Sequence, residues 1–160
     1  MHRFSEALEV LYSANVFSFA GASSVLLFHS LYAMNWRTIR RLHISTVFLV
    51  PTKMAGASDC LPPENYNDWT KACTIIGSLD CLQSFKLDMT IWNFYNWKTL
   101  NLVDNDSLIA IFQPLQNLVV KDFEIKTNIS VDASLTDLLG PLKFRLQQEH
   151  RPYGDAFQRY

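Results

Sequence analysis

Residues 39–44, Ile-Arg-Arg-Leu-His-Ile, follow an apolar-x-x-apolar-x-apolar pattern that the chain repeats twice. The two other copies are residues 82–87, Leu-Gln-Ser-Phe-Lys-Leu, and residues 120–125, Val-Lys-Asp-Phe-Glu-Ile. Each copy follows an apolar segment with helix-like spacing, as parallel strands do in stacked helix–strand units. The pattern therefore predicts three neighbouring strands centred on Leu42, Phe85 and Phe123.

The segments ahead of the second and third copies share one helical spacing. Apolar residues fall at i, i+3, i+4 and i+7 in both, in Trp69, Ala72, Cys73 and Ile76 and again in Leu108, Ile111, Phe112 and Leu115. Each helix ends eight or nine positions before the centre of its strand. Equivalent units with right-handed connections give a mainly parallel sheet backed by helices.

The N-terminal third adds one more unit to this arrangement. Residues 16–19 read as a short strand, residues 23–34 as a helix and residues 39–49 as the next strand. The helix is apolar nearly all round, so we expect it to be buried on more than one side. The long apolar run of residues 39–49 predicts cover on both faces of that strand.

These patterns predict an α/β fold, a short leucine-rich-repeat-like stack of helix–strand units with a mainly parallel sheet. The chain has 160 residues, of which 49% are hydrophobic and 18% charged, as in an ordinary globular domain. We expect one domain over residues 1–142, closed by the apolar segment 135–142, and a polar C-terminal tail over residues 143–160.

Composition disfavours several classes of function and location. The net charge of −1 gives no basic footprint for nucleic acid. The three cysteines are too few for a disulfide framework, and we expect Cys73 and Cys81 to be small buried apolar residues. Reduced thiols and the lack of a secretory signal favour an intracellular protein, cytoplasmic or nuclear.

One alternative reading is a small membrane-associated protein anchored through residues 10–34. This stretch contains no Asp, Glu, Lys or Arg and is long enough to cross a bilayer. It also contains Asn15, Gly21, His29 and several serines, which favour a helix end, a strand and a second helix in a folded core. We therefore expect no stable membrane insertion.

The strongest candidate contact residues are the aromatic side chains Trp92, Phe94, Tyr95 and Trp97. Four aromatic residues within six positions just after a strand cannot all face one core layer. Trp and Tyr dominate binding hot spots, whereas a loop that folds over the sheet would bury the same rings. The segments 50–66 and 88–102, after two of the strands, are the expected contact regions.

We expect no catalytic residues, no metal site and no cofactor. The chain has no His-x-x-x-His, Cys-x-x-Cys or Gly-x-Ser-x-Gly motif and no glycine-rich phosphate loop. An enzyme with a dispersed site remains an alternative, and a nucleophile pair of Cys60 with His43 is its simplest version.

Two segments carry a resemblance to a known family. Residues 5–19, Ser-Glu-Ala-Leu-Glu-Val-Leu-Tyr-Ser-Ala-Asn-Val-Phe-Ser-Phe, and residues 39–44 resemble a large fungal family of uncharacterised, F-box-associated domains. The resemblance covers residues 5–44 closely and continues by pattern to about residue 128. It implies a leucine-rich-repeat-like interaction module, a recognition part of ubiquitin-ligase adaptors.

The chain departs from that family in two places. It lacks the F-box-like helical segment with which members usually begin, so we do not expect it to dock on a ligase scaffold by itself. Ser45 and Thr46 also stand where members frequently have a tryptophan. The prediction is a non-enzymatic protein–protein interaction module whose partner and oligomeric state the sequence leaves open.

Overall fold

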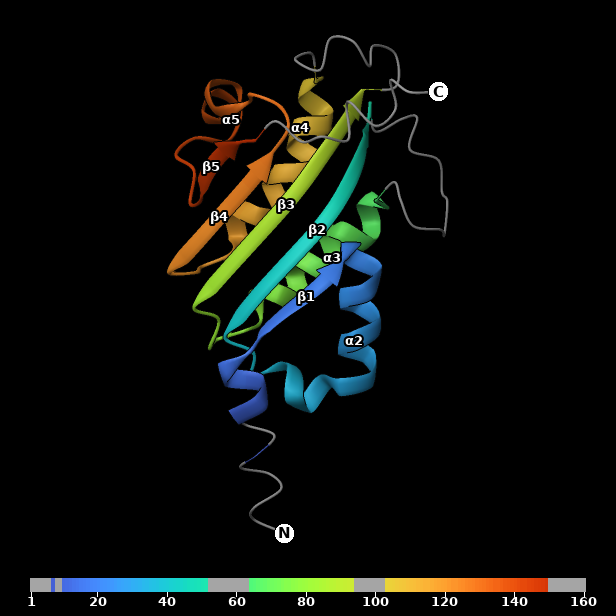
Figure 1. Cartoon of the computed structure of the whole chain (residues 1–160). Helices are drawn as coiled ribbons and strands as arrows, with labels where there is room; N and C mark the ends of the chain where they lie inside the picture. The colour runs from blue at the N-terminus through green and yellow to red at the C-terminus, as the bar shows by residue number, and fades with distance from the viewer. Residues whose placement is uncertain (1–6, 8–9, 52–63, 94–102, 150–160) are drawn as a thin grey trace.

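The computed structural model describes residues 7, 10–51, 64–93 and 103–149. Within these residues the chain forms one five-stranded sheet with the strand order β1-β2-β3-β4-β5, and every neighbouring pair is parallel. Helices connect successive strands (Figure 1). The elements are β1 (Val16–Ala20), α2 (Gly21–Trp36), β2 (Arg41–Val50), α3 (Tyr66–Gly77), β3 (Ser84–Asn93), α4 (Asn105–Phe112), the 3-10 helix η2 (Gln113–Asn117), β4 (Asp122–Thr127), α5 (Asp132–Leu139) and β5 (Arg145–Gln148).

The predicted α/β stack of helix–strand units with a mainly parallel sheet is confirmed. Leu42 pairs with Phe85, and Phe85 pairs with Phe123, so the three repeated segments lie side by side in register. The rings of Phe85 and Phe123 are 5.0 Å apart. The same row extends to Phe17 of β1, which pairs with Leu42.

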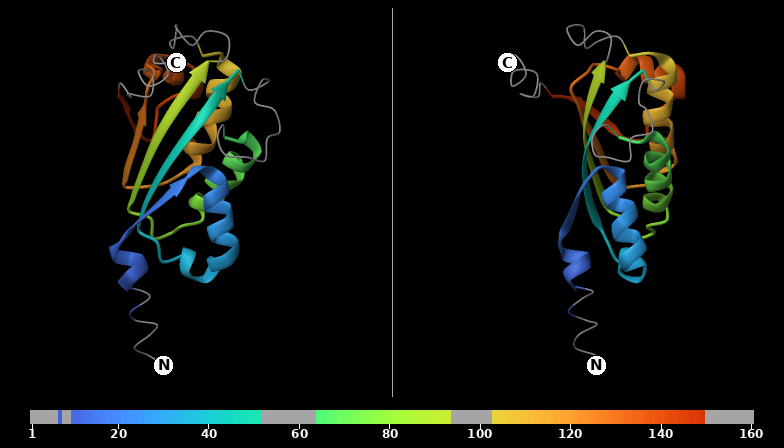
Figure 2. Two further views of the ribbon diagram at one scale, coloured as in Figure 1. Left: turned by 45° about the vertical axis from the view of Figure 1, so that its right-hand side comes forward. Right: turned by 90° about the vertical axis from the view of Figure 1, so that its right-hand side faces the viewer.

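Helices α2, α3 and α4 form a single layer on one face of the sheet. Figure 2 (right) shows the strands nearly edge-on, with these three helices all on the same side of them. The opposite face carries no helix among the described residues. Wholly parallel sheets usually have both faces covered, so a face without helices in the described part of the chain is the most unusual feature of the fold.

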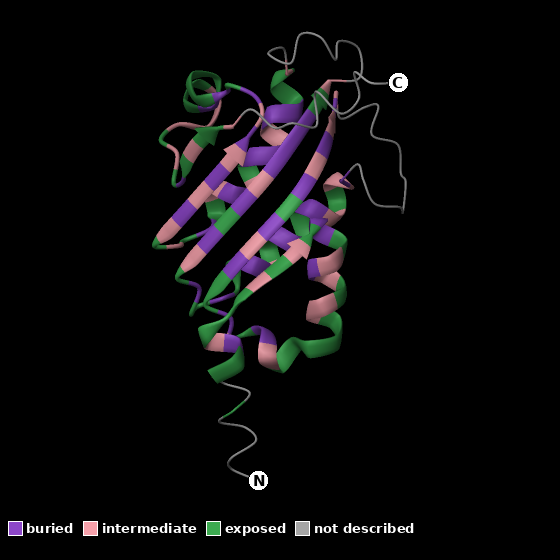
Figure 3. Ribbon diagram, in the orientation of Figure 1, coloured by how far each residue is buried: buried purple, intermediate pink, exposed green. Residues whose placement is uncertain are grey.

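Burial along the strands follows from this one-sided cover. In β2, every second residue from Leu42 to Val50 is buried against the helices, and the residues between them are exposed or half-buried (Figure 3). The expectation that β2 would be covered on both faces is therefore wrong. Its long apolar run arises because Val47 and Leu49 are apolar even though they lie on the uncovered face.

Helix α2 also differs from the prediction. It starts at Gly21 and ends at Trp36, with a kink at Tyr32 (φ −131°, ψ 38°). We expected burial on more than one side, but Leu27 and Leu31 are 62% and 65% exposed. The sheet and α3 cover the other sides of α2, which is the first helix of the layer in the described residues.

Polar side chains cap the other helices of the layer. The side chain of Asn65 accepts hydrogen bonds from the backbone at the start of α3, and Asp104 does the same for α4. The regular helix α4 ends shortly before Pro114, and the chain continues as η2 from Gln113.

The C-terminal boundary of the fold lies further along the chain than residue 142. Arg145–Gln148, which we expected within the polar tail, form β5 and pair with β4. The segment is difficult to recognise because Leu146 is the only apolar residue of the strand. Residues 150–160 lie outside the described part of the chain.

The cysteines agree with the prediction only in part. Cys73 is buried in the core, and burial raises the pKa of its thiol. Cys81 is exposed, so its expected burial is wrong. It lies in the turn ahead of β3, one residue before the buried Leu82. Cys60 lies outside the described residues.

Candidate functional site

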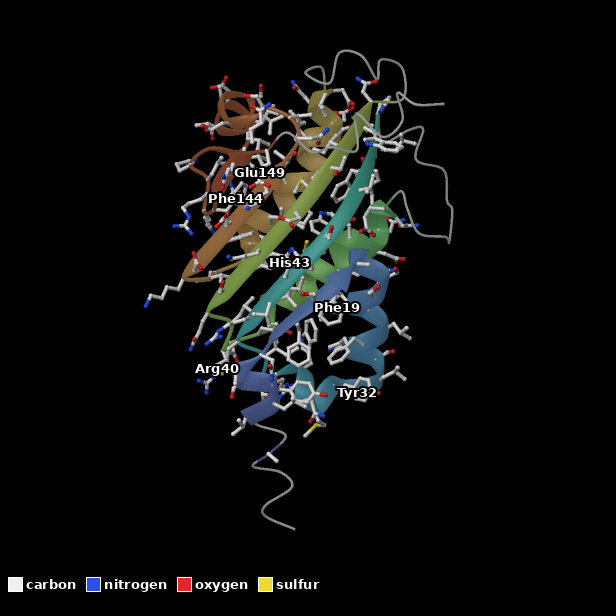
Figure 4. The ribbon with its side chains drawn as sticks, viewed as in Figure 1. Phe19, Tyr32, Arg40, His43, Phe144 and Glu149 are labelled. Atoms are coloured by element: carbon white, nitrogen blue, oxygen red, sulfur yellow. The ribbon has the colours of Figure 1, made fainter. Side chains whose placement is uncertain are left out.

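The candidate site is the uncovered face of the sheet, which we call the open face. It consists of every second residue of each strand, counted from Val16, Arg41, Ser84, Asp122 and Arg145. Strand register aligns these residues in rows that cross the sheet, because paired residues of neighbouring strands point to the same side. Figure 4 labels His43 near the centre of this face.

A hydrogen-bonded group of three side chains joins β1, β2 and β3 on the open face. His43 Nε2 lies 3.1 Å from Asp88 Oδ2, and His43 Nδ1 lies 3.4 Å from Ser18 Oγ. The side chains of His43 and Asp88 are about one-third exposed. Both ring nitrogens of His43 therefore have protein partners, which orient the imidazole across the strands.

These three residue types also occur in nucleophilic catalysis, where a base activates a hydroxyl and a carboxylate orients the base. Such a base normally lies about 2.6–3.2 Å from the nucleophile. The 3.4 Å between His43 Nδ1 and Ser18 Oγ is longer. The geometry favours a network that holds His43 in place. The other nucleophile considered from the sequence, Cys60, lies outside the described residues.

Ion pairs connect β4 and β5 at the opposite side of the open face. Arg145 Nη2 lies 2.6 Å from Asp122 Oδ1 and 3.7 Å from Glu124 Oε2. Lys126 Nζ lies 2.6 Å from Glu149 Oε1, and this hydrogen bond raises the pKa of the lysine. Pairs this exposed each contribute little to folding. Their effect is to fix long charged side chains on the surface.

A shallow hollow of about 540 Å³ lies within the open face. Its lining comes from β1, β2, β3 and β4 and contains charged side chains of both signs. The two signs are mixed on both sides, since β3 contributes Lys86 and Asp88 and β4 contributes Glu124 and Lys126. The hollow is therefore suited to charged groups of a partner, and it offers no enclosed apolar pocket for a small molecule.

The C-terminal end of the open face is more apolar. Val47 and Leu49 of β2 lie beside Thr90 and Trp92 of β3 in the strand register. Trp92 is 40% exposed, although it is the penultimate residue of a strand. An exposed tryptophan beside a charged surface combines an apolar anchor with polar surroundings, as in many protein-binding sites.

The structure therefore places one of the four predicted contact residues on the open face. Trp92 lies in β3, and residues 88–93 of the expected contact segment belong to this strand and not to a loop. Phe94, Tyr95 and Trp97 lie outside the described residues, as do residues 52–63 and 94–102. Of the segment 50–66, Glu64 is buried and Tyr66 donates its hydroxyl hydrogen to the carbonyl of Leu49 at 2.8 Å.

Sequence reasoning missed the buried acid Glu64. Its Oε2 accepts hydrogen bonds from the backbone N–H of Ala22 at 2.9 Å and from Thr46 Oγ1 at 2.5 Å. Burial raises its pKa, and these hydrogen bonds oppose the rise. Glu64 supplies the cap that α2 lacks locally, since Ala20 has no side-chain cap and Gly21 begins the helix with φ +76°. No local motif could identify a cap that lies 42 residues away.

The described residues also bear on the metal-site and membrane alternatives. No group of three or more His, Cys, Asp or Glu side chains there could hold a metal ion. None of the helices described is long and apolar enough to cross a membrane. Residues 10–34 instead form a helical turn, β1 and most of α2.

Together, the one-sided helix layer and the charged open face define a class of protein, an α/β domain of stacked helix–strand units with one exposed sheet face. The chain belongs to the family described as domain of unknown function DUF7730, which matches residues 2–133. No curated protein and no solved structure matches the chain.

Proposed function

We propose that this chain is a non-enzymatic protein-recognition module that binds a partner protein through its open face. The observation that carries the proposal is a wholly parallel sheet that has helices on only one face in the described part of the chain. A sheet of this kind normally buries both faces. Stacked repeat proteins are the main exception, and they use the extended surface so created for binding.

The chemistry of the open face supports a polypeptide partner. Trp92 offers an apolar anchor at one end of β3. The hollow beside it is lined by side chains of both signs: Arg41, Lys86, Lys126, Asp88, Asp122 and Glu124. A surface with both signs of charge beside an exposed aromatic ring suits a protein surface better than a nucleic acid, which requires clustered positive charge.

The sequence resemblance suggests where such a module acts. Residues 5–44 resemble fungal F-box-associated domains, and the repeat pattern resembles leucine-rich repeats. We therefore propose that the partner is a protein of a fungal cell and that the module serves substrate recognition in ubiquitin-ligase adaptors. No catalytic role is assigned to any residue, because the network of His43, Ser18 and Asp88 has the geometry of a structural contact.

The test is affinity capture from fungal extract with the full chain as bait, followed by measurement of the dissociation constant of each recovered partner. Trp92→Ala should weaken binding about 30-fold, since truncation of an aromatic hot spot costs about 2 kcal/mol or more. Val119→Ala is the matched control, because Val119 is 87% exposed and lies outside the strands.

Circular dichroism of both variants verifies that they are folded. A recovered partner whose affinity is unchanged by Trp92→Ala in the folded variant, and unchanged by Lys86→Glu at the other end of the face, would contradict the proposal. Equal losses in Val119→Ala and Trp92→Ala would contradict it as well, because the effect would then be independent of the open face.

A further inference from the structure

His43, labelled in Figure 4, lies near the centre of the open face and has a protein partner for each of its ring nitrogens. Its Nε2 lies 3.1 Å from Asp88 Oδ2 on β3, and its Nδ1 lies 3.4 Å from Ser18 Oγ on β1. Histidine is the side chain that changes its charge between about pH 5 and 8. A histidine held across three strands in this way connects the open face to the pH of its surroundings.

The two partners determine which nitrogen of the neutral ring carries the hydrogen. A carboxylate only accepts hydrogen bonds, so Asp88 requires a donor at Nε2. A neutral imidazole has one donor nitrogen and one acceptor nitrogen, which leaves Nδ1 as the acceptor. Ser18 therefore donates its hydroxyl hydrogen to Nδ1, and its oxygen remains an acceptor for other groups.

Protonation of His43 reverses the hydrogen bond to Ser18. Both nitrogens of an imidazolium are donors, so Nδ1 then donates to Ser18 Oγ, and the serine keeps its hydroxyl hydrogen for another acceptor. The bond to Asp88 is kept and becomes charge-assisted on both sides. Ser18 is exposed, so the open face gains a positive charge and a hydroxyl donor where it had an acceptor.

The charged side chains around His43 come from β2, β3 and β4, since β1 has no ionisable residue. They are Arg41 of the same strand, Lys86 and Asp88 of β3, and Glu124 and Lys126 of β4. Lys86 pairs with His43 in the strand register, whereas the two residues of β4 are one strand further away. The group contains three cations and two anions, so protonation of His43 doubles its net charge.

We propose that His43 is a pH-sensitive switch in the open face. Its neutral form leaves Ser18 as an acceptor, and its protonated form adds a positive charge and turns Ser18 into a donor. The inference rests on the proposed function of the open face as a binding surface and specifies how that surface is regulated. An acidic partner surface over His43 binds more tightly at low pH, and a basic one binds less tightly.

The first test is a pH titration of the full chain without a partner, followed by nuclear magnetic resonance of nitrogen-labelled histidine. Near pH 8 the ring of His43 should be the Nε2–H tautomer, and from about pH 8 to 5 the signals of Ser18 and Asp88 should shift with the same midpoint as His43. His43→Gln should abolish these shifts. His29→Gln is the matched control and should keep them, because His29 lies on α2, behind the sheet, with its ring 5.8 Å from that of Trp36.

The wild-type titration decides the proposal whether or not a partner is known. A neutral His43 in the Nδ1–H tautomer, or a Ser18 signal that does not follow His43, would overturn it.

The second test measures the dissociation constant of a captured partner at about pH 8 and pH 5.5. It should change at least about threefold for the wild type, as expected for one hydrogen bond at an interface, and by less for a folded His43→Gln variant. Equal changes in the two proteins would overturn the regulation. Failure of the proposed function would appear separately, in Trp92→Ala and Lys86→Glu variants that bind like the wild type at constant pH.

Discussion

Replacement of Asn128 by alanine should cost this fold far more than an exposed asparagine normally would. The Asn128 side chain accepts a hydrogen bond from the backbone N–H of Ile91 at 2.8 Å and donates one to the carbonyl of Ile91 at 3.0 Å. Backbone pairing between β3 and β4 ends at Met89 and Thr127. The amide of Asn128 therefore continues the ladder beyond the end of β4 and holds the last residues of β3, among them Trp92.

The size of the effect follows from the two bonds and from the burial of Ile91, which is 1% exposed. Each neutral hydrogen bond contributes about 1 kcal/mol net, and a buried backbone group left without a partner costs about 1–3 kcal/mol. Water can partly replace the lost side-chain amide, so the total loss of stability is smaller than the sum of these costs. We expect Asn128→Ala to reduce the free energy of unfolding by about 2–4 kcal/mol.

Urea unfolding followed by circular dichroism measures this loss. With a denaturant dependence of about 2 kcal/mol/M, the midpoint should fall by about 1–2 M. Asn117→Ala is the control, because Asn117 is exposed at the end of η2 and should leave the midpoint almost unchanged. A loss below about 1 kcal/mol for Asn128→Ala, or equal losses for the two variants, would refute the role assigned to the Asn128 amide.

Two further predictions concern buried polar contacts. Because burial raises the pKa of Glu64 above its ordinary value of 4.5, the folded state binds this proton more tightly than the unfolded state. The stabilisation from protonated Glu64 is complete below pH 4.5 and is lost as the pH rises through the pKa of the folded state. The unfolding free energy of Glu64→Gln, measured between pH 4 and 7, should therefore increase relative to that of the wild type as the pH rises. A difference between the two proteins that stays constant over this range would contradict the prediction. Trp69 is fully buried and donates Nε1–H to the carbonyl of Ile111 at 2.8 Å, so Trp69→Phe should lower the unfolding free energy by about 2–3 kcal/mol in a thermal melt. A melting temperature equal to that of the wild type would show that this bond contributes nothing.

The repeated strands could be predicted from sequence because the fold covers one face of its sheet. One-sided cover imposes apolar residues at every second position, and this is the pattern around Leu42, Phe85 and Phe123. The third copy continues with Asn128 three residues after Ile125, the place where leucine-rich repeats carry asparagine. That signal was available in the sequence and would have identified the side chain that extends the β3–β4 ladder.

Other features could not be read from local patterns. The strand β5 contains a single apolar residue, Leu146, so it has no alternating signature. The cap of α2 comes from Glu64, which only the fold brings near Ala22. The apolar surface of α2 was interpreted as burial, because sequence alone does not show that α2 is the first helix of its layer.

The candidate site was predicted in part for a related reason. Trp92 was identified as a contact candidate from its residue type, and the structure places it on the open face. The charged members of that face, such as Lys86 and Glu124, lie 38 residues apart in the sequence and meet only through strand register. No motif connects them, and each one alone resembles an ordinary surface residue.

The measurement that tests the recognition surface most directly compares two charge reversals in binding to a captured partner. Lys86→Glu changes the open face, and Lys71→Glu changes the exposed side of α3 on the opposite side of the sheet. Both lysines are exposed, so both variants should fold as the wild type does. We expect the dissociation constant of the partner to rise at least about tenfold for Lys86→Glu and to stay unchanged for Lys71→Glu. Equal effects, or a loss confined to Lys71→Glu, would contradict binding through the open face.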